Sequence, residues 1–176
     1  DGSPFMTPVP NMFDWEARIK NMNLAKVDIA VVSLSCPNVY WGGEAISTKA
    51  AKIMNDAFAA GQRAYPDRIR WLASLPWQYP KAAVAELRRA LKKGAVGVMV
   101  LANIIGKHLT DPLFEPVWKE IDKHDLPVLI HPSAPPGSSE LGMHEFQLTA
   151  PIGFTFDTSL AVSRIDRKST RLNSSH

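Results

Sequence analysis

Apolar residues recur along this chain with two alternating periods. Short β-branched runs are apolar at almost every position, which is typical of buried strands. Longer stretches between them carry apolar residues every three to four positions, which predicts helices. The predicted strands cover residues 27–35, 70–75, 96–101 and 126–131. The predicted helices cover residues 14–25, 44–65, 80–93, 110–124 and 153–165.

Strands that alternate with helices, each strand apolar throughout, indicate parallel βα units in an α/β fold. Two architectures have this pattern, a doubly wound open sheet and a segment of a (β/α)₈ TIM barrel. The loops after the strands are longer and richer in His, Asn, Tyr and Trp than the turns after the helices, as in a barrel with a functional carboxyl edge. The sequence also lacks both glycine-rich phosphate-binding motifs, GxGxxG and GxxxxGK(S/T). We therefore predict a partial TIM barrel with four of the usual eight strands.

Composition and charge exclude several classes of protein. The 176 residues are 45% hydrophobic and 21% charged, which is ordinary for a globular domain. The net charge of +3 comes from Arg167, Lys168 and Arg171, because the rest of the chain has equal numbers of acidic and basic residues. We expect no nucleic-acid partner, and no membrane partner because no apolar run approaches about 20 residues. The single Cys36 fits a reducing compartment, so we expect a cytoplasmic protein.

The two ends of the chain differ from its middle. Residues 1–10 are rich in proline, and residues 167–176 carry one large apolar side chain and no helical period. We expect one domain fragment over residues 1–165. The polar tail, residues 166–176, is expected to be non-native and disordered.

His131 is the strongest candidate for chemistry. It ends the strand 126–131 and precedes Pro132, so it lies at the carboxyl edge, where barrel enzymes hold metal ligands and bases. An imidazole there can bind Zn²⁺ or another divalent ion, or it can instead bond a loop carbonyl. One histidine is not a metal site, because a catalytic Zn²⁺ has three protein ligands. The sequence contains no HxH, HExxH or CxxC motif to supply them.

Four other residues near the predicted carboxyl edge are candidates for substrate binding. Tyr40, Trp41 and Trp77 follow the first two strands, where they can wall a pocket for a planar substrate or pack against helices. Asn103 follows the third strand and can bond a substrate or form a turn. Cys36 also follows a strand, but without a base beside it in the sequence we expect a small buried residue rather than a nucleophile.

Three long segments, together with the loops inside them, are similar to one known family. They are VDIAVVSLSCPNVYW (27–41), YPDRIRWLASLPWQYPKAAVAELRRAL (65–91) and GAVGVMVLANIIGKHLTDPLFEPVWKEIDKHDLPVLIHPSAPPG (94–137). Over about residues 13–165 the chain resembles the amidohydrolase-related family, and within it the branch of the aminocarboxymuconate-semialdehyde decarboxylases. The resemblance implies a metal-dependent (β/α)₈ barrel that acts on a small carboxylic acid. It also implies a homo-oligomer, a dimer, for the full-length enzyme.

The resemblance further implies a metal centre. Members of the family hold a divalent ion, usually Zn²⁺, with an HxH pair on the first strand, a His on the fifth and an Asp on the eighth. The fifth-strand ligand corresponds to His131 in LIHPS, so the predicted strands are the second to the fifth, and the other ligands have no counterpart here. Two departures argue against the branch's own substrate. Ser133 stands where those decarboxylases carry a Trp, and residues 5–10 lack the Arg that would grip a carboxylate.

Residues and resemblance together predict a fragment of a metal-dependent decarboxylase or hydrolase. The parent enzyme is expected to act on a small unsaturated or aromatic carboxylic acid through metal-activated water. The fragment alone is expected to be inactive. The alternative is a non-catalytic α/β module that binds small molecules and is complete at this length.

Overall fold

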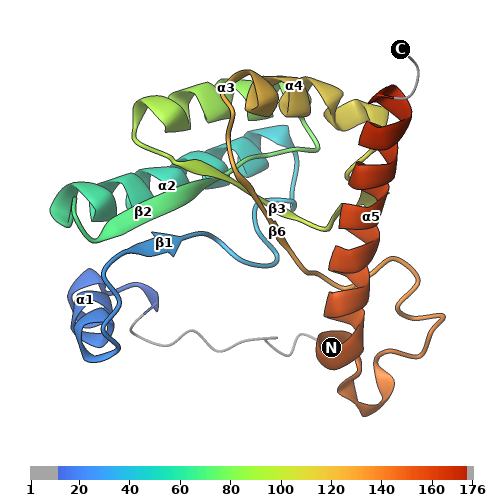
Figure 1. Ribbon diagram of the computed structural model, residues 1–176, viewed down its shortest axis with the longest axis horizontal. Coiled ribbons are helices and arrows are strands. Elements are labelled where there is room, and N and C mark those ends of the chain that lie inside the picture. Colours follow the sequence, from blue (N-terminus) through green and yellow to red (C-terminus); the bar gives the residue numbers. More distant parts are fainter. Residues whose placement is uncertain (1–11, 174–176) are drawn as a thin grey trace.

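Four parallel strands form one sheet in the order β1-β2-β3-β6 (Figure 1). The computed structural model describes residues 12–173, so the segment 5–10 and His176 lie outside the described residues. The strands are β1 (Ala30–Val32), β2 (Ile69–Ser74), β3 (Gly97–Leu101) and β6 (Val128–His131). All four fall within or beside the predicted runs. The parallel pairing confirms the expected half of a barrel.

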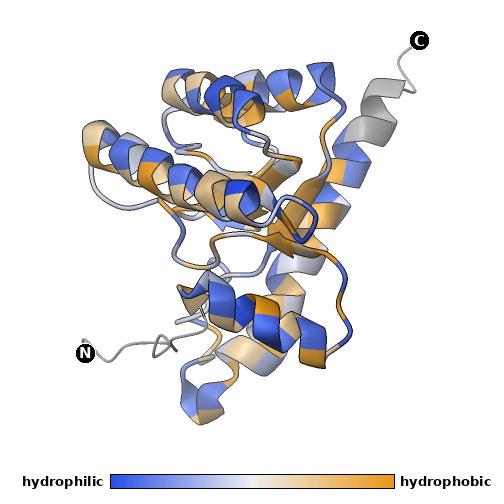
Figure 2. Cartoon of the chain, turned by 90° about the vertical axis from the view of Figure 1, so that its left-hand side faces the viewer, coloured by the Kyte–Doolittle hydropathy of each residue, from blue (hydrophilic) through white to orange (hydrophobic). Residues whose placement is uncertain are grey.

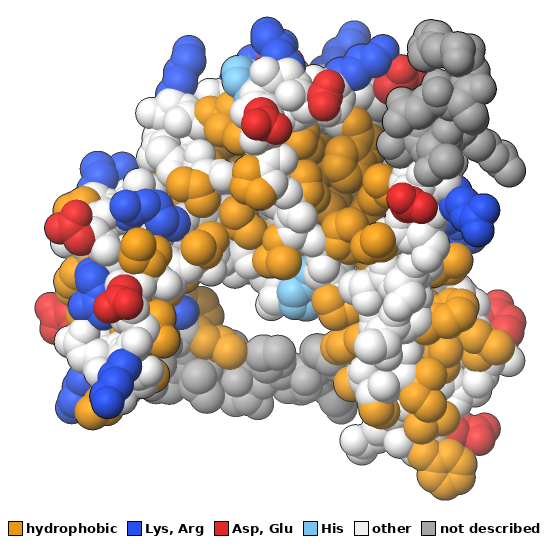
Figure 3. All heavy atoms as spheres, in the orientation of Figure 1, with side chains coloured by type: hydrophobic (Ala, Val, Ile, Leu, Met, Phe, Trp, Pro, Cys, Tyr) orange, Lys and Arg blue, Asp and Glu red, His pale blue; other side chains and the backbone are white. Residues whose placement is uncertain are grey.

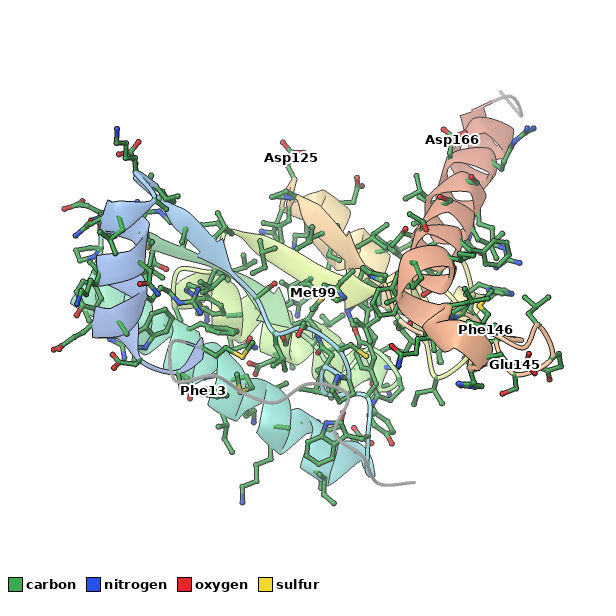
Figure 4. The ribbon with its side chains drawn as sticks, turned by 90° about the horizontal axis from the view of Figure 1, so that it is seen from below. Phe13, Met99, Asp125, Glu145, Phe146 and Asp166 are labelled. Atoms are coloured by element: carbon green, nitrogen blue, oxygen red, sulfur yellow. The ribbon has the colours of Figure 1, made fainter. Side chains whose placement is uncertain are left out.

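Helices separate the strands along the chain. They are α1 (Trp15–Leu24), α2 (Glu44–Ala64), α3 (Pro80–Lys92), α4 (Glu115–Lys123) and α5 (Phe154–Asn173). The helices α2, α3 and α4 lie side by side over one face of the sheet, while α1 lies near β1 and α5 at the opposite end (Figures 1 and 4). Figure 2 shows apolar strands against helices that carry both polar and apolar residues.

The helix α3 shows how the sequence produces these elements. Pro80 occupies its first turn, where the missing N–H costs no hydrogen bond. Ala83, Leu87 and Ala90 are fully buried, because residues three and four apart share one face of a helix. Gly94 follows the helix with φ +99°, a conformation that favours glycine.

Alternate residues of each strand point to opposite faces of the sheet. Trp71, Val98 and Val100 are fully buried on the face that the helices cover, which we call the outer face. The opposite, inner face carries Val31 and Leu129, whose side chains are 56% and 46% exposed. The inner face, which forms the interior of a closed barrel, is therefore exposed at the two outermost strands, whereas Leu72, Met99 and Leu101 on the same face are buried. A doubly wound open sheet, the other architecture that the sequence allowed, would instead have helices on both faces.

The inner face is closely packed around Gly97. A Cβ added to Gly97 would come 2.6 Å from the Pro127 carbonyl oxygen and 2.9 Å from a methyl carbon of Leu72. No side chain larger than hydrogen fits there without a shift of the backbone. The absence of a side chain at Gly97 thus lets β3 approach the start of β6.

Ion pairs, two of them made by the buried Glu86 and Glu120, join the helices of the outer layer. The Arg89 guanidinium contacts the fully buried Glu86 at 2.7 Å and Asp56 of α2 at 2.6 Å. Arg88 donates two hydrogen bonds of 2.7 Å to Glu120 of α4. These pairs hold α2, α3 and α4 in register with one another.

Several local features differ from the sequence-based expectations. The strand β1 has three residues rather than nine, because it pairs only with β2 and is regular only along that contact. A short antiparallel hairpin, β4 (Asn103–Ile104) and β5 (Lys107–His108), replaces the expected plain loop. A 3₁₀ turn, η2 (Pro112–Phe114), precedes α4, and Asp111 caps it by accepting from the Leu113 N–H. Two further short turns, η3 (Glu145–Gln147) and η4 (Thr149–Gly153), lie in the loop before α5.

The C-terminal helix is longer than the sequence pattern predicts. The expected helix ends at residue 165, whereas α5 continues to Asn173. The helix thus includes residues 166–173 of the segment expected to be a polar tail. Its polar composition does not prevent this, because Lys, Arg and Leu are good helix formers. None of the helices in the part of the chain that the structure describes is long and apolar enough to cross a membrane.

Candidate active site at the carboxyl edge of the sheet

His131 ends β6 at the carboxyl edge of the sheet. Its Cα pairs with Leu101, the last residue of β3, so the ends of these two strands are adjacent. Val128 and Ile130 pack against the helix-covered core, and the residues between them must face the other way. His131 therefore lies on the inner face together with Leu129. Met99, which pairs with Leu129, lies near the middle of the sheet (Figure 4).

The imidazole of His131 is held by a local hydrogen bond. Its Nδ1 lies 2.7 Å from the carbonyl oxygen of Pro132. A carbonyl oxygen only accepts, so Nδ1 carries the proton and the Nε2 lone pair stays free. The residue is half-buried. This is the arrangement in which a histidine binds a divalent metal.

A buried carboxylate lies directly beside this segment. Asp157, in the first turn of α5, is 3% exposed. Its Oδ2 accepts hydrogen bonds from the backbone N–H and the hydroxyl of Ser133, both at 3.1 Å. The amide nitrogen of Asn103 donates to both carboxylate oxygens at 3.2 Å. Three buried polar side chains from β4, the loop after β6 and α5 thus form one network.

Asn103 connects this network to the hairpin. Its amide nitrogen also lies 2.9 Å from the Ser133 hydroxyl oxygen and 3.1 Å from the Ala134 carbonyl oxygen, so its two protons are shared among these acceptors. Its Oδ1 accepts the backbone N–H of Gly106 at 3.1 Å. The side chain is saturated with partners from the protein itself. The structure thus gives Asn103 a structural role beside the proposed substrate-binding role.

Two residues of the loop after β1 lie near the same edge. Burial raises the pKa of the Tyr40 phenol well above its usual value, and the nearby Leu101 backbone lowers it by less. Partial desolvation by the surrounding protein, followed by the charge of Asp157, raises the pKa of the Cys36 thiol. Cys36 is exposed, contrary to the expectation of a buried residue, because it lies in the turn that leaves β1. Its raised pKa keeps the thiol protonated, which agrees with the expectation that it is not a nucleophile.

The two tryptophans are not brought to this edge together. Trp41 is 50% exposed and donates from its indole nitrogen to the Asn38 carbonyl at 2.9 Å. Trp77 is fully buried, with its ring centroid 6.0 Å from that of Phe114 and 5.1 Å from that of Trp118. These contacts are packing within the outer layer, so Trp77 presents no surface to a ligand here.

The described residues do not form a complete metal centre. Between residues 12 and 173, no group of three or more His, Cys, Asp or Glu side chains is placed to hold a metal ion. His131 fits as one ligand because its Nδ1 is committed to the Pro132 carbonyl, but residues 12–173 place no complete ligand set around it. Hydrophobic side chains gather elsewhere, between α4 and α5, in the view of Figure 3.

Sequence reasoning missed Asp157 and the contribution of Ser133. Asp157 lies in the pattern FTFDTS near a helix start, where an acidic residue is ordinarily an exposed partner of the helix dipole. Ser133 lies in a loop rich in Pro, Ser and Gly, where serine is common. The available signal was that Ser133 directly follows the strand-ending His-Pro pair. Nothing in the local sequence shows that both side chains are buried.

Comparison with known proteins gives consistent relatives. The family model described as amidohydrolase matches residues 18–172. The 2-amino-3-carboxymuconate-6-semialdehyde decarboxylase of Dictyostelium discoideum is 33% identical over 165 residues, which cover 92% of this chain and 45% of the relative. The gamma-resorcylate decarboxylase of Rhodococcus jostii is 32% identical over 135 residues, covering 68% and 40%. The chain thus spans less than half the length of these relatives.

Solved structures confirm the fold. The 5-carboxyvanillate decarboxylase of Novosphingobium aromaticivorans, solved with bound manganese, superposes with a TM-score of 0.83 at 26% identity over 91% of this chain and 49% of that one. The 2,6-dihydroxybenzoate decarboxylase from Rhizobium gives a TM-score of 0.77 at 29% identity, covering 84% and 49%. The half-open sheet of this chain corresponds to about half of each structure. From the family match and the partial barrel, we conclude that the chain belongs to the amidohydrolase family.

Proposed function

We propose that this chain is part of a metal-dependent carboxy-lyase in which His131 is one ligand of a divalent ion. The substrate would be a small aromatic or unsaturated carboxylic acid, the class named for the relatives described above. The observation that carries the proposal is the free Nε2 of His131 at the carboxyl edge, with Nδ1 committed to the Pro132 carbonyl. The remaining ligands would come from outside the described residues.

Decarboxylation is favoured over hydrolysis by the relatives. The four proteins compared above are all decarboxylases. When bound, the metal would supply a positive charge that stabilises negative charge developing on the substrate. Among the described residues, His131 would hold the ion and Tyr40 would border the substrate. Trp41 and Asn103 remain candidates for substrate contact through their positions at the rim, while the buried Trp77 would act only through packing.

The identity of the metal is part of the proposal. The family resemblance predicts zinc, whereas 5-carboxyvanillate decarboxylase was solved with manganese. An imidazole ligand suits either ion, so His131 does not discriminate between them. We propose a divalent ion of this class, and a cytoplasmic homodimer for the full-length enzyme.

The alternative of a complete binding module fits the geometry less well. A self-sufficient sheet would cover its apolar residues, yet Val31 and Leu129 are exposed on the inner face. The outer strands β1 and β6 each have a neighbour in the sheet on one side only. The exposed inner-face residues favour a barrel segment over a closed domain, and the two strand edges are compatible with it.

The test measures metal content in the protein expressed with the coding sequence that flanks this chain. The protein with His131 intact should copurify with Zn²⁺ or Mn²⁺. The variant His131→Ala should lose most of the bound metal and also the ability to release carbon dioxide from the substrate. The matched control is His144→Ala, an exposed loop histidine. Unchanged metal content in His131→Ala would refute the assignment of this residue. If His131→Ala loses its metal but the protein with His131 intact releases no carbon dioxide from any acid of this class, the metal assignment stands and the reaction class is refuted.

A further inference from the structure

A single peptide group connects the buried Asp157 to the imidazole of His131. The peptide between Pro132 and Ser133 presents its N–H to the Asp157 carboxylate at 3.1 Å. Its carbonyl oxygen, on the other side of the same plane, lies 2.7 Å from Nδ1 of His131. The peptide unit is planar and rigid, so the carboxylate that fixes one end also fixes the direction of the other.

We propose that Asp157 is a positioning residue that sets the proton of His131 on Nδ1 by acting through the Pro132–Ser133 peptide. The inference rests on the proposed function, in which Nε2 of His131 binds the metal. Asp157 touches neither the metal nor the substrate in this scheme. It determines which ring nitrogen is available to the metal and where that nitrogen points.

Electrostatics reinforces the geometry. A carboxylate that accepts the N–H polarises the peptide and makes the carbonyl oxygen on the other side a stronger acceptor. A stronger acceptor favours the tautomer that donates from Nδ1. Metal-bound histidines commonly use a carbonyl or carboxylate to fix the unliganded nitrogen. In this chain the Pro132 carbonyl contacts the imidazole, and the Asp157 carboxylate acts on that carbonyl through the same peptide.

The surrounding contacts show that the link is built into the fold. Asp157, Ser133 and Asn103 are 3%, 8% and 9% exposed, so water competes little for their hydrogen bonds. The carboxylate receives three different donors, two from Ser133 and one from Asn103. Pro132, whose ring restricts φ, leaves the segment between His131 and Ser133 little freedom to relax. A change at Asp157 must therefore be transmitted to the imidazole.

The experiment uses the whole 176-residue chain with histidines labelled with nitrogen-15. Long-range proton–nitrogen spectra at about pH 8.5, above the ordinary titration range of imidazole, distinguish a protonated from an unprotonated ring nitrogen. Wild-type His131, assigned by comparison with His131→Ala, should show a protonated Nδ1. Asp157→Asn removes the charge and turns one acceptor into a donor. Its His131 nitrogen signals should move toward each other as the two tautomers mix.

Two variants separate the proposed link from general loss of structure. Ser133→Ala removes the hydroxyl contact with Asp157 but keeps the backbone N–H, so its His131 spectrum should match wild type. Asp166→Asn makes the same chemical change at an exposed position of the same helix, which Figure 4 shows toward the other end of α5. It should also leave the spectrum unchanged. A spectrum that shifts equally in Asp157→Asn and Ser133→Ala would overturn the proposal.

The wild-type chain alone decides the matter if Asp157→Asn does not fold. A proton on Nε2 of wild-type His131 contradicts the proposal directly. So does rapid hydrogen exchange at the Ser133 amide, which should be protected although it lies in a loop.

A manganese titration then distinguishes this inference from the proposed function. Mn²⁺ should broaden the His131 resonances before those of the exposed His144, and that selectivity tests the metal role. If Asp157→Asn leaves the two tautomers equally populated, the Mn²⁺ concentration needed to broaden the His131 resonances rises roughly twofold. Selective broadening that is identical in wild type and Asp157→Asn would refute the positioning role and keep the metal role. Broadening without selectivity in wild type would refute the metal role.

Discussion

The two faces of the sheet are built from alternate residues of the same strands, yet they differ in burial. On the outer face, Trp71, Val98 and Val100 are inaccessible to solvent beneath α2, α3 and α4. On the inner face, Val31 and Leu129 remain about half exposed. The difference shows that helices alone complete one side of this fold. The inner face is only partly covered, because Leu72, Met99 and Leu101 are buried whereas Val31 and Leu129 are not.

The largest effect is expected from removing volume on the outer side. Leu87 of α3 is fully buried, and Leu87→Ala should lower the free energy of unfolding by about 2–5 kcal/mol through lost burial and a residual cavity. The same change at the half-exposed Leu129 should cost less than about 1 kcal/mol. Urea denaturation of both variants measures the contrast. Similar losses at the two positions would mean that the inner face is also packed in solution.

A second prediction concerns the close packing of the inner face at Gly97. Gly97→Ala should destabilise the chain by about 1–3 kcal/mol, because the new methyl group would meet the Pro127 carbonyl at 2.6 Å. Gly43→Ala is the control, since nothing lies within 4 Å of its added Cβ. Thermal unfolding should rank Gly97→Ala clearly below Gly43→Ala. An unchanged midpoint for Gly97→Ala would show that β3 and β6 separate easily.

A third prediction tests the charges of the outer layer by their pH dependence. The Arg88 hydrogen bonds lower the pKa of Glu120 to about 2, below the ordinary value of about 4.3. A pKa lowered by folding contributes stability that is complete above the ordinary pKa and disappears as the pH falls toward 2. Glu120→Gln should therefore unfold at a lower temperature than wild type at pH 7, and the gap should close between about pH 4.5 and 2.

Its control is Asp122→Asn, an exposed residue of the same helix. Calorimetry across this pH range should show a much smaller gap for it. A Glu120→Gln gap that stays constant with pH would show that packing, and not the ionised pair, accounts for the loss.

The smallest change in stability is expected on the exposed inner face. Val31 lies on the edge strand β1, where an apolar surface beside an unpaired strand edge favours association. Val31→Lys should change the free energy of unfolding by no more than about 0.5 kcal/mol but reduce self-association. Val162→Lys, at an exposed valine of α5, is the matched control. Equal reduction by both variants in sedimentation experiments would argue against an inner-face contact.

The sequence predicted most accurately those elements whose ends carry residues that start or stop a helix. Proline at the start, basic residues in the last turn and glycine beyond the end placed α3 within one residue of its observed bounds. The β-branched runs located the four strands, but the run at 27–35 exceeded β1 because strand regularity depends on a partner. The hairpin of β4 and β5 was missed, since its two-residue strands depend on contacts such as His108 with Arg164.

The candidate site was predictable at the backbone and not at the level of its supporting contacts. The position of His131 follows from a strand that ends in His-Pro. The burial of Trp77 does not follow from its loop, because Phe114 and Trp118 reach it from 37 or more residues away along the chain. Asp157 lies 24 residues from Ser133, and only the packing of α5 brings them together.

The amide of Asn103 makes the exposed hairpin and the buried rim mechanically dependent on each other. One end of this side chain holds the Gly106 N–H at the hairpin turn, and the other end holds Ser133 and Asp157. An insertion or deletion at the tip, on the surface of the molecule, would pull on the segment next to His131. The length of this surface turn is therefore constrained by the Asn103 side chain, although that side chain is buried beneath the tip.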